Sequence, residues 1–126
     1  MLALAGLRDA VIDWLRDEAR TIDPAPLSLV IFGSFARGDA REGSDIDVLA
    51  VPPTGLVGTD DDRWVDTLGR WQDRAGRIAG NPVNVLLASV EELPGLVGRT
   101  GSVWESAARD GVLIAGADLA ALAAGR

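Results

Sequence analysis

Short apolar runs alternate with longer amphipathic segments along this chain of 126 residues, and few folds accommodate that order. Runs that are rich in β-favouring residues and bounded by Gly, Pro or a turn predict strands at 27–32, 45–51 and 83–87. Apolar residues at helical spacing predict helices at 2–19, 34–40 and 63–79. The resulting α-β-α-β-α-β order predicts an α/β layer fold.

The segment after the third predicted strand reads as helices with one further strand. Ser89 and Ser102 each precede a Glu by three residues, which is the spacing of a capping box and predicts a helix start at each serine. We expect a short strand at 112–114 and a final Ala-rich helix at 117–124. No internal repeat or linker divides the sequence, so we predict a single domain over residues 1–126.

Two further features have structural interpretations. Trp64 and Trp71 are seven residues apart on one predicted helix, and this spacing favours core packing over base stacking. The stretch 54–62 is rich in Gly and Asp and predicts a mobile loop. Its three aspartates, 60–62, are interpreted as a solvated loop and helix start in preference to a metal site.

The residue types that are missing narrow the chemistry. The chain has no Cys, His, Lys or Tyr, which excludes thiolate and imidazole catalysis, a Walker lysine and an ordinary zinc site. Carboxylates, hydroxyls, Arg and backbone amides remain, and oxygen donors suit a hard cation such as Mg²⁺. The net charge of −7 argues against an extended nucleic-acid surface. No apolar run is long enough for a membrane span, and we expect a cytoplasmic protein.

Gly33 directly follows a predicted strand, and Ser34 begins the next predicted helix. Glycine permits a sharp turn and a close backbone approach to a ligand. Free N–H groups and the dipole at a helix start favour an anion such as phosphate. The same pattern also describes an ordinary capped helix that binds nothing, so both interpretations stay open at this point.

Asp45 and Asp47 open the second predicted strand. Residues i and i+2 of a strand point to one face, so both carboxylates can converge on one cation or on an adjacent pair. Acids at the start of an otherwise apolar strand are costly to bury unless they bind something. The alternative is that both lie at a solvent-exposed strand end. Together with the strand-to-helix turn at Gly33 and Ser34, however, they provide the smallest set of groups needed for metal-assisted phosphoryl or nucleotidyl transfer.

The run Gly33-Ser34-Phe35-Ala36-Arg37-Gly38, followed after a spacer by Ser44-Asp45-Ile46-Asp47-Val48-Leu49, resembles the signature of the polymerase-β-type nucleotidyltransferase superfamily. The chain is most similar to the small minimal nucleotidyltransferases. The resemblance implies a nucleotidyltransferase-like fold, with a small mixed sheet and additional C-terminal helices.

The resemblance also implies attack on the α-phosphate of a nucleoside triphosphate such as ATP, with Mg²⁺ or Mn²⁺ as cofactor. By this similarity, Asp45 and Asp47 would be the catalytic, metal-holding residues. The nucleotide-binding positions would be Gly33, Ser34, Arg37 and Ser44. Arg37 could touch phosphate or pair with Asp39, Glu42 or Asp45, and Ser44 could instead be a polar turn residue.

Catalytic relatives usually add a third carboxylate from the next strand, and here that position aligns with Asn84. Asn can ligate a metal through its carbonyl oxygen but cannot act as a base. Another acid could substitute, with Asp66, Asp73 and Glu91 as candidates. Alternatively, the enzyme works with two acids, or the domain binds nucleotide without turnover.

Two classes of function therefore compete. The first is an enzyme that transfers a nucleoside monophosphate to a protein or other hydroxyl acceptor. Minimal nucleotidyltransferases often pair with a small helical HEPN-type protein in toxin–antitoxin modules, which makes an antitoxin role a plausible context. The second is a catalytically weak or inactive module that binds a nucleotide or a partner. The replacement of the third carboxylate by Asn84 favours this second class.

Overall fold

Four strands form one mixed sheet in the computed structural model, which describes residues 4–38, 45–55 and 59–125. The strands are β1 (Ser28–Phe32), β2 (Ile46–Val51), β3 (Val83–Leu87) and β4 (Val112–Gly116). They lie in the order β3-β2-β1-β4. β1 is antiparallel to β2 and to β4, whereas β2 and β3 are parallel. The predicted α/β fold with a small mixed sheet is confirmed.

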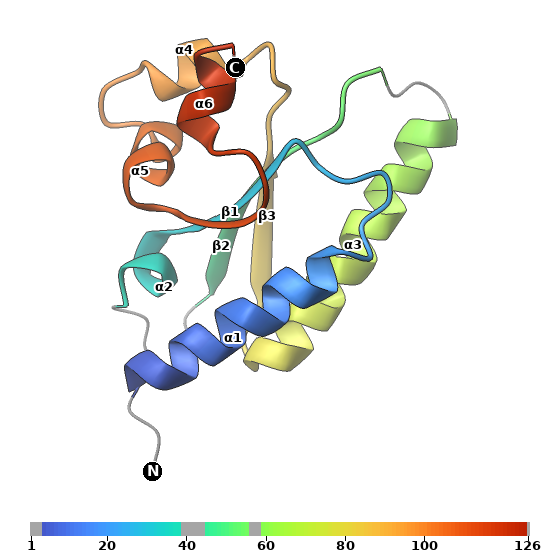
Figure 1. Ribbon diagram of the computed structural model, residues 1–126, viewed down its shortest axis with the longest axis vertical. Coiled ribbons are helices and arrows are strands. Elements are labelled where there is room, and N and C mark those ends of the chain that lie inside the picture. Colours follow the sequence, from blue (N-terminus) through green and yellow to red (C-terminus); the bar gives the residue numbers. More distant parts are fainter. Residues whose placement is uncertain (1–3, 39–44, 56–58, 126) are drawn as a thin grey trace.

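Six helices accompany the strands in the described part of the chain. The helices are α1 (Leu4–Ala19), α2 (Gly33–Arg37), α3 (Thr59–Ala79), α4 (Leu93–Val97), α5 (Val103–Asp110) and α6 (Leu119–Ala123). Figure 1 shows α1 and α3 together on one side of the sheet and the short helices α4, α5 and α6 together on the other. None of these helices is both long and apolar enough to cross a membrane.

Two apolar clusters follow from this layering. The first cluster lies between the sheet and the long helices α1 and α3, and it contains Ile31 and Val48 from the sheet. The second cluster lies between the sheet and the helices α4 to α6, and it contains Val30 and Leu49. Neighbouring strand residues thus face opposite clusters, as strand alternation requires. β1 and β2 are buried on both faces and form the centre of the core.

Both tryptophans of α3 belong to the first cluster. Trp64 is 1% exposed and Trp71 is fully buried, and the Trp71 indole Nε1 donates to the Leu15 carbonyl at 3.3 Å. A buried indole usually finds such a partner for its N–H, which also ties α3 to α1. The packing interpretation is confirmed, because neither ring is available for stacking on a base.

Several helix boundaries differ from the sequence prediction. The helix predicted at 34–40 ends at Arg37, because Gly38 adopts a left-handed conformation with φ of 79° and closes the helix. α3 begins at Thr59. The prediction of a loop at 54–62 is therefore wrong for residues 59–62, which form the start of the helix. Asp61 and Asp62 lie near the N-terminus of α3, where negative charge interacts favourably with the helix dipole.

The two predicted capping boxes have different outcomes. Ser102 caps α5 as predicted, with its Oγ accepting the Glu105 N–H at 3.0 Å. Ser89 does bond to the Glu92 carboxylate through both its N–H and its hydroxyl, each at 3.0 Å, but only a turn follows it. α4 starts at Leu93 instead, which places Pro94 in the first turn, where its missing N–H costs no hydrogen bond.

Candidate functional site

The turn from β1 into α2 is made at Gly33. Phe32 is extended, and Gly33 follows with φ of 75°, a conformation that other residues rarely adopt. Ser34, the next residue, is half-buried. Because α2 has only five residues, it offers an anion fewer aligned peptide dipoles than the two-turn helix that the sequence predicts. The nucleotide-binding roles of Gly33 and Ser34 remain predictions.

Asp47 lies directly against this turn. It is the register partner of Phe32 across the β1–β2 ladder. A Cβ added to Gly33 would come within 3.0 Å of the Asp47 Oδ2 atom, which is closer than ordinary van der Waals contact. The backbone conformation therefore favours glycine here, and a Cβ would in addition require the Asp47 carboxylate to shift.

Asp45 and Asn84 complete a polar group around Asp47. Asp45 precedes β2 and is exposed, whereas Asp47 is half-buried. Asn84 is the register partner of Asp47 on β3, and its Nδ2 donates to the Asp45 Oδ2 at 2.9 Å. Residues in register on neighbouring strands point to the same face. The structure therefore brings Asp45, Asp47 and Asn84 together at one end of the sheet.

The other acids proposed from the sequence lie elsewhere. Asp66 and Asp73 are exposed on α3, which packs on the face of the sheet opposite to Asp47. Glu91 follows the C-terminal end of β3, whereas Asn84 lies near its start. Within residues 4–38, 45–55 and 59–125, no three acidic side chains are grouped as a metal site would require. None of these three acids therefore joins the aspartate pair.

Of the remaining predicted positions, Arg37 is exposed as the last residue of α2. Ser44 lies outside the described residues, as do Asp39 and Glu42, the proposed partners of Arg37. The predictions for these positions stay open.

Arg8 is a supporting residue that the sequence analysis missed. Its Nε donates to the Phe35 carbonyl at 3.0 Å, and its second terminal nitrogen donates to the Ala36 carbonyl at 2.6 Å. A cation at the C-terminal carbonyls of a helix is favourable, and here it fastens α2 to α1. Nothing in the sequence separates Arg8 from the other arginines of that amphipathic helix, since its partners are backbone groups 27 and 28 residues away.

The sequence model of the nucleotidyltransferase domain family matches residues 12–98, which is more than half of the chain and includes β1, α2, β2 and β3. The chain belongs to this family. The matched region contains the Gly33 turn, both aspartates and Asn84. A search of curated proteins finds no significant match.

Solved structures share the fold of this nucleotidyltransferase domain at low sequence identity. A toxin–antitoxin crystal structure with AMP-PNP aligns at a TM-score of 0.52 and 17% identity, covering 94% of this chain and 82% of that one. A mutant of the toxin–antitoxin MntA–HpeT aligns at 0.50 and 15%, with 94% and 81% coverage. A structure described as a minimal nucleotidyltransferase aligns at 0.49 and 23%, with 88% and 95% coverage.

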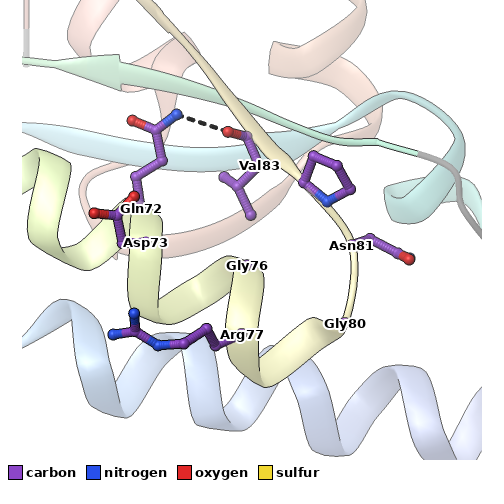
Figure 2. Close-up of a pocket in the computed structure, with 8 residues that line it drawn as sticks. Gln72, Asp73, Gly76, Arg77, Gly80, Asn81 and Val83 are labelled. Carbon is purple, nitrogen blue, oxygen red and sulfur yellow. Dashed lines mark hydrogen bonds between the residues drawn. The ribbon is translucent and has the colours of Figure 1, made fainter.

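A cleft of about 610 Å³ lies outside this group of residues, between the C-terminal half of α3 and the start of β3 (Figure 2). Gln72, Asp73 and Arg77 line it from α3, and its far wall is formed by residues 80–83. The Gln72 Nε2 donates to the Val83 carbonyl at 2.7 Å, the contact drawn in Figure 2. The cleft includes Asp73, one of the acids considered for the third position, but none of Gly33, Ser34, Arg37, Asp45, Asp47 and Asn84. We therefore take the group of Asp45, Asp47 and Asn84 beside the Gly33 turn, and not this cleft, as the candidate site.

Proposed function

We propose that this chain, acting as one domain over residues 1–126, is a nucleotidyltransferase that moves a nucleoside monophosphate from a triphosphate to a hydroxyl acceptor. The observation that carries the proposal is the convergence of Asp45, Asp47 and Asn84 beside the Gly33 turn. Membership of the nucleotidyltransferase domain family supports the same reaction class. We propose Gly33, Ser34, Arg37 and Ser44 as the residues that contact the triphosphate.

The donor set fits Mg²⁺ or Mn²⁺. Asp45 and Asp47 would hold the cation through carboxylate oxygens, and Asn84 can add an amide oxygen, which are the ligand types that hard cations prefer. When bound, such a cation neutralises phosphate charge during nucleotidyl transfer. Exposure of Asp45 leaves this end of the site open to a ligand from solvent.

For the biological setting, we propose a cytoplasmic antitoxin that uses ATP and acts on a HEPN-type partner protein. Two toxin–antitoxin structures share the fold, and one of them contains the ATP analogue AMP-PNP. The other carries two aspartate-to-glutamate changes at positions two apart, which is the spacing of Asp45 and Asp47. The proposed protein acceptor is consistent with this setting.

A second candidate function is a module that binds nucleotide without turnover. The hydrogen bond from Asn84 to Asp45 supports it, because an amide that donates to a carboxylate takes the place where catalytic relatives are expected to supply a third acid. An amide cannot accept the proton of an incoming hydroxyl as a carboxylate can.

Transfer of label from α-labelled ATP tests the proposal. The protein is incubated with Mg²⁺ or Mn²⁺ and a lysate of its native host, and labelled macromolecules are then sought. We expect label with the wild-type protein and none with the Asp45→Ala plus Asp47→Ala variant. The double change Asp61→Ala plus Asp62→Ala removes the same charge from the exposed start of α3 and should leave labelling intact.

Each outcome separates the two candidates. Nucleotide binding without label from any triphosphate would favour the binding module. Label that survives loss of Asp45 and Asp47 would mean that another site performs the transfer. If Asn84 occupies the third-acid position, Asn84→Asp should raise the rate of labelling, and a decrease would contradict that assignment.

A further inference from the structure

Helix α2 begins at the Gly33 turn and carries Ser34, yet it has little stability of its own. It has five residues, of which only Ala36 is buried, and the preceding Phe32 has a side chain that cannot cap it. A helix this short is unstable in water unless tertiary contacts hold it. Its N-terminal end continues directly from β1, so the orientation of α2 depends on what holds its C-terminal end.

Arg8 of α1 bonds to two successive carbonyls at that end, where α2 lies beside α1 (Figure 1). Its Nε donates to the Phe35 carbonyl at 3.0 Å and its Nη2 to the Ala36 carbonyl at 2.6 Å. Its Nη1 donates to the Asp9 carboxylate at 3.1 Å, so all three nitrogens are engaged. Because a guanidinium is a rigid planar fork, two such bonds restrain the direction of both carbonyls, which one bond to a flexible ammonium would not.

We propose that Arg8 is a positioning residue for nucleotide binding, because it holds α2 in the orientation that presents Gly33 and Ser34 to the triphosphate. This inference rests on the proposed function of the site. Arg8 acts through the backbone of α2 and is not itself assigned a contact with the nucleotide. It also precedes residue 12, where the match to the nucleotidyltransferase family begins, so this support lies outside the region that the family model describes.

The sheet holds the aspartate pair without help from α2. Asp47 is in register with Phe32 on one side and with Asn84 on the other, and Asn84 donates to Asp45 at 2.9 Å. Loss of Arg8 should therefore leave the metal-holding residues in place and disturb the contacts to the triphosphate. Contacts that are equally strong in the bound substrate and in the transition state affect KM and leave kcat unchanged. We therefore expect weaker nucleotide binding at an unchanged maximal rate.

Arg8→Met and Arg16→Met form a matched pair of variants. Arg16 also lies on α1, and its Nε also donates to a backbone carbonyl, that of Leu113 at 3.1 Å, but Leu113 belongs to β4. Each change removes one positive charge and an arginine–carbonyl contact from the same helix. Calorimetric titration with AMP-PNP and Mg²⁺ should show about tenfold weaker binding for Arg8→Met, the loss expected from hydrogen bonds to a charged group. The labelling rate at saturating ATP should stay within about twofold of wild type. Arg16→Met should change neither quantity.

Amide hydrogen exchange in the nucleotide-free protein measures the restraint on α2 without any turnover. The Gly38 N–H bonds to the Phe35 carbonyl at 3.2 Å, and NMR should show that it exchanges faster in Arg8→Met but not in Arg16→Met. Arg8→Lys retains the charge without the rigid fork, so it should recover only part of the lost affinity.

Three results would overturn the positioning role, namely unchanged Gly38 exchange in Arg8→Met, equal effects of the two Met variants, or full recovery by Arg8→Lys. A fall in the maximal rate with unchanged AMP-PNP binding would also contradict it. A wild-type protein that neither binds AMP-PNP nor labels an acceptor would instead refute the proposed function on which the inference rests.

Discussion

Substituting Gly33 by Ala should disturb the protein twice, once through its backbone and once through Asp47. At φ of 75°, a residue with a Cβ costs about 1 kcal/mol more than Gly. The added Cβ also approaches the Asp47 Oδ2 to 3.0 Å, and turning that carboxylate away from its preferred rotamer costs roughly 1 kcal/mol. We therefore expect Gly33→Ala to lower the free energy of unfolding by about 2 kcal/mol.

Gly80→Ala separates the two contributions. Gly80 has φ of 76°, and a Cβ there would meet nothing within 4 Å, so this variant should carry only the backbone cost of about 1 kcal/mol. Urea denaturation measures both variants. In an Asp47→Ser background the extra penalty of Gly33→Ala should shrink, whereas that of Gly80→Ala should not change. Calorimetric titration with Mg²⁺ should show weaker binding for Gly33→Ala alone. Equal penalties, with no coupling to Asp47, would refute the close contact.

Three further predictions concern stability and pH. Ser102→Ala removes the α5 cap and should lower the free energy of unfolding by about 1 kcal/mol in urea denaturation, with an unchanged value arguing against the cap. Trp71→Ala should cost about 3–5 kcal/mol because the ring is fully buried, whereas Trp14→Ala, 56% exposed, should change the same measurement by less than about 0.5 kcal/mol. Hydrogen bonds from the Ser89 backbone and hydroxyl hold the pKa of Glu92 below its ordinary value. Folding therefore favours the ionised form, and its stabilisation is present above the unfolded pKa and lost as pH falls through the folded pKa. Glu92→Gln should reduce the acid sensitivity of unfolding, and a carboxyl NMR titration with an ordinary midpoint would contradict this.

Most of the fold could be predicted because its signals are local. The strand at 83–87 shows as an apolar run after Gly80-Asn81-Pro82, and the short strand predicted at 112–114 proves to be the start of β4. The errors lie where tertiary context decides the boundary. Ser89 and Glu92 do form their hydrogen bonds, yet the helix begins only at Leu93. This start places Pro94 in the first turn, the one part of a helix where a proline is well tolerated.

The candidate site could be predicted in its residues but not in its contacts. The spacing of Asp45 and Asp47 is visible in the sequence, whereas their meeting with Asn84 depends on the parallel register of β2 and β3, which no single-strand pattern encodes. The contact between Asp47 and Gly33 depends in the same way on the register of β1 and β2. The hydrogen bonds from Arg8 to α2 could not be predicted, because no pattern in either segment indicates that the two are in contact.

The limits of the family match and of the folding unit do not coincide. The match ends at residue 98, yet β4, which lies beyond it, is the second hydrogen-bonded neighbour of β1. A fragment cut at that limit would leave β1 as a bare sheet edge and would remove Trp104 and Leu119 from the second cluster. The strand that leads into the Gly33 turn would then be open to water on one side. A fragment that retains the architecture of the site must therefore run through α6, well past the last residue that resembles the family.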